Sequence, residues 1–173
     1  MALAHDLLTQ ARQLAHREPQ RPKQASLRRS VSTAYYALFH LLVDAAAREV
    51  VSGTNSEALR GRVARACDHG NMKRLCQGIV TWNEKSPPQP LGALLESSPS
   101  ASLRQVAGAF MELQQARHEA DYDLTCRLSR DDARELLETA EGAFKAFEGM
   151  HRRDGERRVF VLGVVFHGRW NRA

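Results

Sequence analysis

Apolar positions recur at helical spacing along most of this chain of 173 residues. The pattern predicts helices over residues 2–17, 23–51, 56–79, 102–120 and 129–149. The second of these segments has apolar residues on several sides, which is typical of a central, buried helix. The third has the weakest pattern, and its glycines at positions 61 and 70 leave open a division into two helices.

Two segments depart from this pattern. Residues 82–101 hold four of the six prolines and predict a loop, with one turn of helix at Leu91–Leu95 left open. Residues 151–173 start with a polar stretch and continue with the apolar, β-branched sequence VFVLGVVFHGRW, which predicts a strand or a hairpin turning at Gly163. This tail could pack on the helices, pair with a second copy or be a disordered chain end.

The expected fold class is therefore all-α. We expect an up-and-down bundle of four to five helices over residues 1–150. A short apolar strand or hairpin extension, basic at its start, is expected to follow over residues 151–173.

Composition narrows the class of protein. Hydrophobic residues make up 43% and charged residues 26% of the chain, which is typical of a folded protein. The first residues lack the basic start and apolar run of a secretory leader, and no apolar stretch approaches the ~20 residues of a membrane span. Cys67, Cys76 and Cys126 are an odd number without CxxC spacing, which favours reduced thiols. We therefore expect a cytoplasmic protein without a metal ion, another cofactor or a membrane partner.

Charge is unevenly distributed along the chain. Residues 1–74 carry 12 basic and 6 acidic side chains, residues 75–150 carry 7 and 12, and residues 151–173 carry 6 and 2. The net charge is +5. Basic surfaces attract the phosphates of nucleic acids, but arginine also serves simply to solvate helices, and charge alone leaves both open.

Arg117 is the most informative position for a functional site. Its spacing from Phe110 and Leu113 places it on the core-facing side of its helix, where a cation is costly unless it is paired or faces a cleft. His118, Asp121 and Tyr122 follow within about one turn and a half. A purely structural interpretation is also open, in which Arg117 pairs with Asp121 one turn later and Tyr122 plugs the end of the bundle.

Three segments together resemble a known family. RRSVSTAYYALFHLL at residues 28–42 resembles the signature helix of HEPN-domain proteins, and RHEADYDL at residues 117–124 resembles their second signature. ACDHGNMKRLC at residues 66–76 is similar to their histidine-containing middle segment. The resemblance covers roughly residues 5–148 and leaves the tail unexplained. It implies a HEPN-like bundle that forms a two-fold homodimer.

The resemblance also implies a catalytic motif. In many HEPN proteins an arginine, a polar neighbour and a later histidine form a metal-independent ribonuclease at the dimer interface. Arg117 matches the arginine and His118 the polar neighbour, but Tyr122 stands where the histidine is expected. Tyrosine has a pKa of about 10, far from the value that suits a general base near neutral pH. The candidate catalytic residues are Arg117, His118 and Tyr122.

Other residues could complete such a site. Arg28 and Arg29, with Arg117, are candidates to bind nucleic acid or phosphate, although a solvated helix start explains the first two equally well. Tyr36, His40 and Asp121 are candidate supporting residues. His40 could line the same cleft as Tyr36, or it could be a hydrogen-bonded core histidine.

These observations leave three functions open. The first is an RNA-associated protein of a toxin–antitoxin or defence system, which acts as a weak metal-independent ribonuclease or binds RNA without cleaving it. The second is a non-catalytic dimeric interaction module whose partner is a nucleotidyltransferase or an antitoxin. The third is a bundle that binds a nucleotide through Arg117. Fold alone does not choose among them, because one fold supports many functions.

Overall fold

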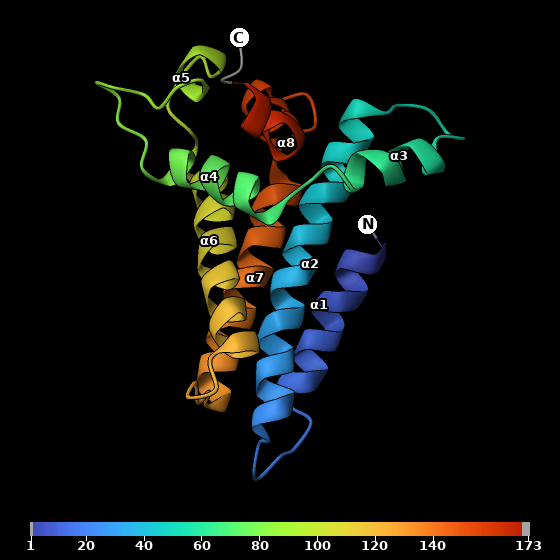
Figure 1. Cartoon of the computed structure of the whole chain (residues 1–173), viewed down its shortest axis with the longest axis vertical. Helices are drawn as coiled ribbons and strands as arrows, with labels where there is room; N and C mark the ends of the chain where they lie inside the picture. The colour runs from blue at the N-terminus through green and yellow to red at the C-terminus, as the bar shows by residue number, and fades with distance from the viewer. Residues whose placement is uncertain (1, 171–173) are drawn as a thin grey trace. The chain divides into compact units, whose positions relative to one another are not determined.

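A computed structural model describes residues 2–170 of the chain, and every regular element in that range is helical (Figure 1). The helices are α1 (Ala2–Ala15), α2 (Gln24–Val50), α3 (Glu57–Ala64), α4 (His69–Val80), α5 (Leu91–Leu94), α6 (Ala101–Tyr122), α7 (Arg130–Gly149) and α8 (Gly155–Phe166), followed by a 3-10 turn, η1 (His167–Arg169). The prediction of an all-α fold is confirmed. Within residues 2–170, no helix has both the length and the apolar character that a membrane span needs.

The segment over residues 56–79, for which the sequence leaves open a division into two helices, forms the two helices α3 and α4. The break lies at residues 65–68, so Gly61 is within α3 and Gly70 within α4. Asp68 precedes α4 with an extended backbone, and its carboxylate accepts a hydrogen bond of 2.8 Å from the backbone nitrogen of Asn71. Asp68 is thus an N-cap, which starts a new helix by satisfying a backbone donor that the first turn leaves unpaired. The single helical turn left open in the proline-rich loop is present as α5.

The chain forms two compact units. The first unit comprises the chain up to Leu41 together with Ala109–Lys145. The second comprises Leu42–Gly108 together with the chain from Ala146 onward. The boundary at residue 150 that the sequence suggested stays a prediction.

The first unit is a helical bundle. It is made of α1, the first part of α2, the later part of α6 and the first part of α7, and successive helices alternate in direction (Figure 1). The predicted burial of this part of α2 is confirmed, as Leu27, Val31, Tyr35 and Leu38 are at most 1% exposed. Near the α6–α7 end, small side chains allow the helices to approach closely. A buried cluster there combines the small side chains of Ala15, Ala120 and Ala133 with Leu27 and Val31.

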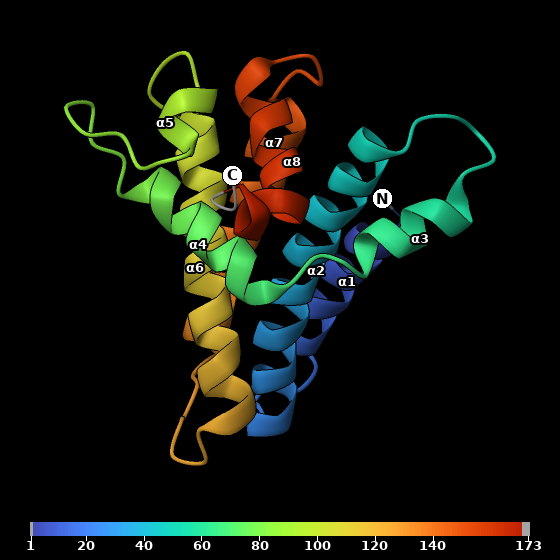
Figure 2. The same cartoon turned by 45° about the horizontal axis from the view of Figure 1, so that its top comes forward.

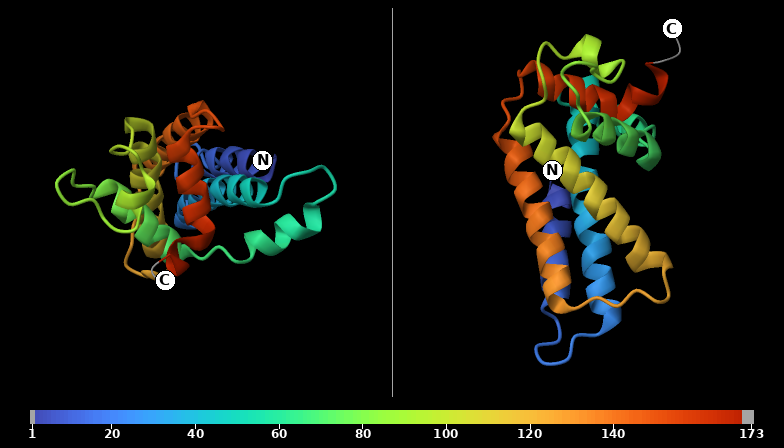
Figure 3. Two further views of the ribbon diagram at one scale, coloured as in Figure 1. Left: turned by 90° about the horizontal axis from the view of Figure 1, so that it is seen from above. Right: turned by 90° about the vertical axis from the view of Figure 1, so that its left-hand side faces the viewer.

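The second unit contains α4 and α8, which pack against each other (Figure 2 and Figure 3). The prediction of a strand or hairpin in the tail is wrong, because Gly155–Phe166 is the helix α8. The buried positions of the tail are 157, 160, 161, 163 and 164. The large side chains among them, at 157, 160, 161 and 164, follow helical rather than alternating spacing. Burial of this face overrides the β-propensity of its valines, since propensity is a weak preference beside packing.

Gly163 lies at the close approach of α8 to α4. A Cβ atom at this position would lie 2.8 Å from Cδ1 of Leu75, a fully buried residue, and 3.0 Å from Cη2 of Trp170. We expect Gly163→Val to lower the free energy of unfolding by about 1–3 kcal/mol, because valine adds three carbons where one already overlaps its neighbours. Chemical denaturation followed by circular dichroism measures this loss.

Gly108 in α6 provides the matched control. A Cβ atom there meets no side chain or distant backbone atom within 4 Å. Gly108→Val is expected to leave stability unchanged or to raise it slightly, since valine is a better helix former than glycine. Equal losses in the two variants would contradict the close contact between α8 and α4.

Candidate functional site

Arg117 lies on the inner side of α6, within the first unit. Phe110 and Leu113, two turns and one turn earlier on α6, are fully buried, so the side chain of Arg117 follows the same face of the helix. Its Nη2 atom donates a hydrogen bond of 2.9 Å to the hydroxyl of Tyr36 on α2. Its side chain is only 20% exposed. Arg117 on α6 is therefore held by a tyrosine of α2, 81 positions earlier in the chain.

The predicted pairing of Arg117 with Asp121 is present. Nε of Arg117 lies 2.9 Å from Oδ2 of Asp121, one helical turn later. The contact is an ion pair rather than a directed hydrogen bond, because the buried Nε has no hydrogen-bond partner. The same carboxylate oxygen accepts a bond of 3.3 Å from the hydroxyl of Ser32 on α2. Ser32, which the sequence did not point to, thus ties the carboxylate to the neighbouring helix.

Aromatic rings surround the guanidinium group. Cζ of Arg117 lies 5.4 Å from the ring centroids of Tyr36 and Tyr122 and 6.0 Å from that of Tyr35. A guanidinium at such distances is attracted by the negative faces of the rings. Burial alone would lower the pKa of Arg117, but Tyr36, Asp121 and Tyr122 together hold that pKa above its usual value. The group therefore remains a fixed cation.

Tyr122 is not a plug for the end of the bundle, so that part of the structural interpretation is wrong. Its side chain is 63% exposed at the last residue of α6, and Leu124 just beyond it is 86% exposed. The exposed ring of His118 lies beside it, with 5.1 Å between the ring centroids and an angle of 48° between the planes. The ring of Tyr122 thus lies between the exposed ring of His118 and the mostly buried guanidinium of Arg117.

His40 adjoins this group through Tyr36. The ring centroids of His40 and Tyr36 are 6.5 Å apart, and those of His40 and Phe39 are 5.5 Å apart. Burial lowers the pKa of His40 below its usual value, which favours the neutral imidazole. The half-buried His40 thus lies next to Tyr36 on α2, one turn further from its start.

Arg28 and Arg29 have different surroundings. Arg28 donates hydrogen bonds to the backbone oxygens of Ala120, at 3.1 Å, and of Cys126. It thereby satisfies carbonyl groups at the end of α6 and in the following loop, which would otherwise lack partners. Arg29 is exposed on α2. Phosphate binding by either arginine stays a prediction.

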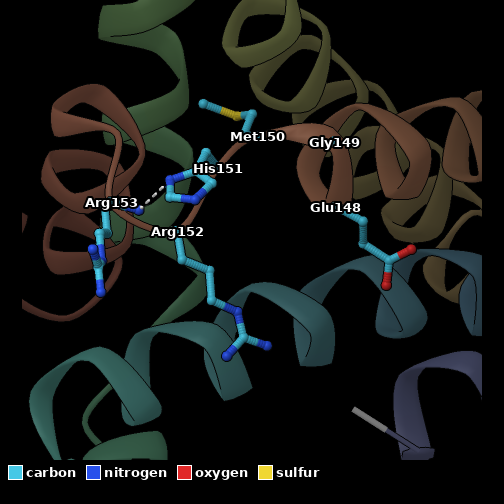
Figure 4. A pocket seen from close by; sticks show the side chains of 6 residues that line it. All are labelled: Glu148, Gly149, Met150, His151, Arg152 and Arg153. Atoms are coloured by element: carbon cyan, nitrogen blue, oxygen red, sulfur yellow. Dashed lines mark hydrogen bonds between the residues drawn. The ribbon is translucent and has the colours of Figure 1, made fainter.

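The second unit has a surface hollow whose lining residues are none of those described above. It has a volume of about 690 Å³ and is lined by residues 148–153 (Figure 4). The side chains of Arg152 and Arg153 extend from it in different directions, and the backbone nitrogen of Arg153 donates to Nδ1 of His151 at 3.2 Å. None of the candidate site residues lines it.

Other chemistry is sparse in the part of the chain that the structure describes. Residues 2–170 contain no group of three or more histidine, cysteine or acidic side chains placed to hold a metal ion. The three cysteines are free thiols, and burial raises the pKa of Cys67 to about 11. Among the candidate residues, Arg117 contacts Tyr36, Asp121 and Tyr122.

No family model, curated protein or solved structure matches the chain.

Proposed function

We propose that the protein is an RNA-associated member of the HEPN type, acting in the cytoplasm within a toxin–antitoxin or defence system as a weak, metal-independent ribonuclease. The carrying observation is the 2.9 Å hydrogen bond from Arg117 to Tyr36, which joins the two segments that resemble the HEPN signatures. A homodimer is part of the proposal, since the resemblance implies that a second copy helps to build the site. In a weaker form of the same proposal, the protein binds RNA without cleaving it.

The cluster offers the groups that cleavage of an RNA backbone needs. When a ribose 2′-oxygen attacks the adjacent phosphorus, the bond to the 5′-oxygen breaks, leaving a 2′,3′-cyclic phosphate and a 5′-hydroxyl. Arg117 would stabilise the charge on the phosphoryl oxygens, because its planar group donates several hydrogen bonds. His118 would accept the proton of the attacking hydroxyl, and Tyr122 would supply one to the leaving oxygen. We expect a slow reaction, because Tyr122 stands where the resemblance implies a histidine, and histidine is the usual proton donor near neutral pH.

Incubation of purified protein with mixed RNA in buffer containing EDTA tests the proposal. Wild-type protein is expected to yield fragments with 2′,3′-cyclic phosphate ends, and Arg117→Ala is expected to remove them. Arg134→Ala is the matched control, because Arg134 is an arginine of α7 whose side chain is 52% exposed. Equal cleavage by wild type and Arg117→Ala would point to a contaminating nuclease and remove the ribonuclease assignment.

Tyr122 favours a second candidate function. A tyrosine in place of the expected histidine, together with the exposed Leu124, suits a non-catalytic dimeric module that binds a nucleotidyltransferase or an antitoxin. This alternative predicts no RNA turnover and co-purification with such a partner when the two are produced together. A nucleotide-binding bundle would instead show thermal stabilisation by nucleotides that Arg117→Ala abolishes.

A further inference from the structure

Arg157, in the first turn of α8, is a buried cation. In the part of the chain that the structure describes it is the one charged residue that is buried, at 9% exposure. No residue in the range 2–170 accepts a hydrogen bond from its guanidinium or forms an ion pair with it, and its Nε atom is buried without a partner. Its Cζ atom lies 4.6 Å from the centroid of the Phe147 ring. A ring face offsets only part of the cost of burying a cation, so Arg157 keeps donors available for an anion.

The acidic side chains around Arg157 are bonded to other groups. Glu49 on α2 accepts a hydrogen bond of 2.8 Å from Nε of Arg158. Asp154 accepts a bond of 3.0 Å from the backbone nitrogen of His151. Neither carboxylate therefore pairs with the buried guanidinium, although both lie close enough to act on its charge.

Arg152 adds a second unpaired cation. It is exposed, and its side chain makes no hydrogen bond or ion pair with any residue between 2 and 170. Burial and the charge of Arg152 lower the pKa of Arg157 below its usual value, against the opposite effects of Glu49 and Asp154. Arg152 also lines the hollow of about 690 Å³ at residues 148–153 (Figure 4). Two like charges at one corner of the second unit repel each other unless an anion lies near both.

The start of α8 offers backbone donors at the same corner. Asp154 stands at the N-cap position but makes no side-chain bond to the first turn, and Glu156 bonds to the backbone nitrogen of Ser100 instead, at 2.9 Å. The first backbone nitrogen of α8 with a backbone partner is that of Arg158. The N–H groups of residues 155–157 and the positive end of the helix dipole therefore favour an anion beside Arg157.

We propose that Arg152 and Arg157 bind a phosphate group, either free or carried by a small molecule, at the corner between α7 and α8. A phosphate group carries about two negative charges near neutral pH, which matches two unpaired guanidinium groups, whereas a carboxylate carries one. Planar guanidinium groups and free backbone N–H groups both suit phosphate oxygens. The hollow beside Arg152 would hold the organic part of a phosphate ester. The site uses none of the residues of the proposed function and does not depend on it.

Isothermal titration calorimetry of the full chain with inorganic phosphate and with ribose 5-phosphate tests this site. Both probes are expected to bind wild type, and Arg157→Met and Arg152→Gln are each expected to weaken binding about tenfold or more. Arg153→Gln is the matched control, because Arg153 is an exposed arginine of the same loop whose side chain extends in a different direction from that of Arg152 (Figure 4). It is expected to bind like wild type. Tighter binding of ribose 5-phosphate than of phosphate would support an ester as the ligand, and equal binding would support free phosphate.

Thermal unfolding separates a phosphate site from a cation that serves packing alone. Methionine can remain on the ring of Phe147, and Arg157→Met removes an unpaired buried charge. Without phosphate, this variant is therefore expected to unfold at the wild-type temperature or above it, and with phosphate it is expected to lack the stabilisation that wild type gains. Equal stabilisation of wild type and Arg157→Met would place the anion elsewhere and overturn the proposal. Equal losses of affinity in Arg152→Gln and Arg153→Gln, or a wild-type protein that binds neither probe, would also overturn it.

Discussion

Under the proposed function, lysine in place of Arg117 is expected to reduce RNA cleavage by about 100-fold or more, close to the effect of alanine. The guanidinium of Arg117 donates to Tyr36, pairs with Asp121 and lies beside three aromatic rings. A lysine ammonium is a single compact donor on a flexible stem and does not reproduce these planar contacts. The variant therefore keeps the positive charge but loses the direction of the donors. Initial rates on a fluorogenic RNA substrate in EDTA measure the loss.

Arg29→Lys is the control for this exchange. Arg29 is an exposed arginine of α2, and we expect its replacement by lysine to change the rate less than about twofold. Thermal unfolding of both variants shows whether the fold is retained. Wild-type activity in Arg117→Lys would mean that a positive charge alone is sufficient. The contacts of Arg117 with Tyr36 and Asp121 would then have no part in the reaction.

The contacts of Arg117 within α6 could be predicted from the spacing of residues along that helix. Arg117 was placed on the inner face because Phe110 and Leu113 precede it at helical spacing, and both are buried. Its pairing with Asp121 followed from their separation of four residues, which places both on one side of a helix. Contacts within one helix depend only on the spacing of residues along it, so they can be predicted from the sequence.

The contacts of Arg117 with α2 could not be derived in the same way. The bond to Tyr36 spans 81 positions in the chain and depends on which helices are neighbours and on how they are rotated. The hydrogen bond from Ser32 to Asp121 spans 89 positions and has no signal in either segment taken alone. The exposure of Tyr122 was also missed, because a tyrosine at a helix end fits a plug or an exposed ring equally well.

The composition and the spacing of the tail point to different structures. Valine and phenylalanine favour strands, and their abundance after residue 158 led to the prediction of a strand or hairpin. The buried side chains of Phe160, Val161 and Val164 nevertheless follow a helical repeat. The same repeat includes Arg157, whose guanidinium lies 4.6 Å from the ring centroid of Phe147. Because Arg157 is charged, the helical repeat of apolar residues in the tail is hard to recognise from the sequence.

Phe110→Ala is expected to lower the free energy of unfolding by about 3–5 kcal/mol, the largest stability effect that we expect in the chain. Phe110 is fully buried, and its ring centroid lies 5.6 Å from that of Tyr35. Tyr35 is also fully buried and contacts Tyr36, with 5.3 Å between ring centroids. Truncation of Phe110 therefore leaves a cavity beside Tyr35, which in turn contacts the tyrosine that binds Arg117. Urea denaturation monitored by circular dichroism measures the loss.

Leu124→Ala and Phe110→Leu make this measurement specific. Leu124 is 86% exposed, and we expect its truncation to cost less than about 0.5 kcal/mol. Phe110→Leu keeps part of the buried volume and is expected to cost less than Phe110→Ala, because the cost rises with the size of the cavity. If Phe110→Ala were as stable as Leu124→Ala, Phe110 would not lie in the core, and the packing that orients Tyr35 and Tyr36 toward Arg117 would be wrong. Arg117→Lys removes no core volume, so its free energy of unfolding is expected to stay close to that of wild type. A loss of RNA cleavage in that variant would then be due to the guanidinium group and not to the packing around Phe110.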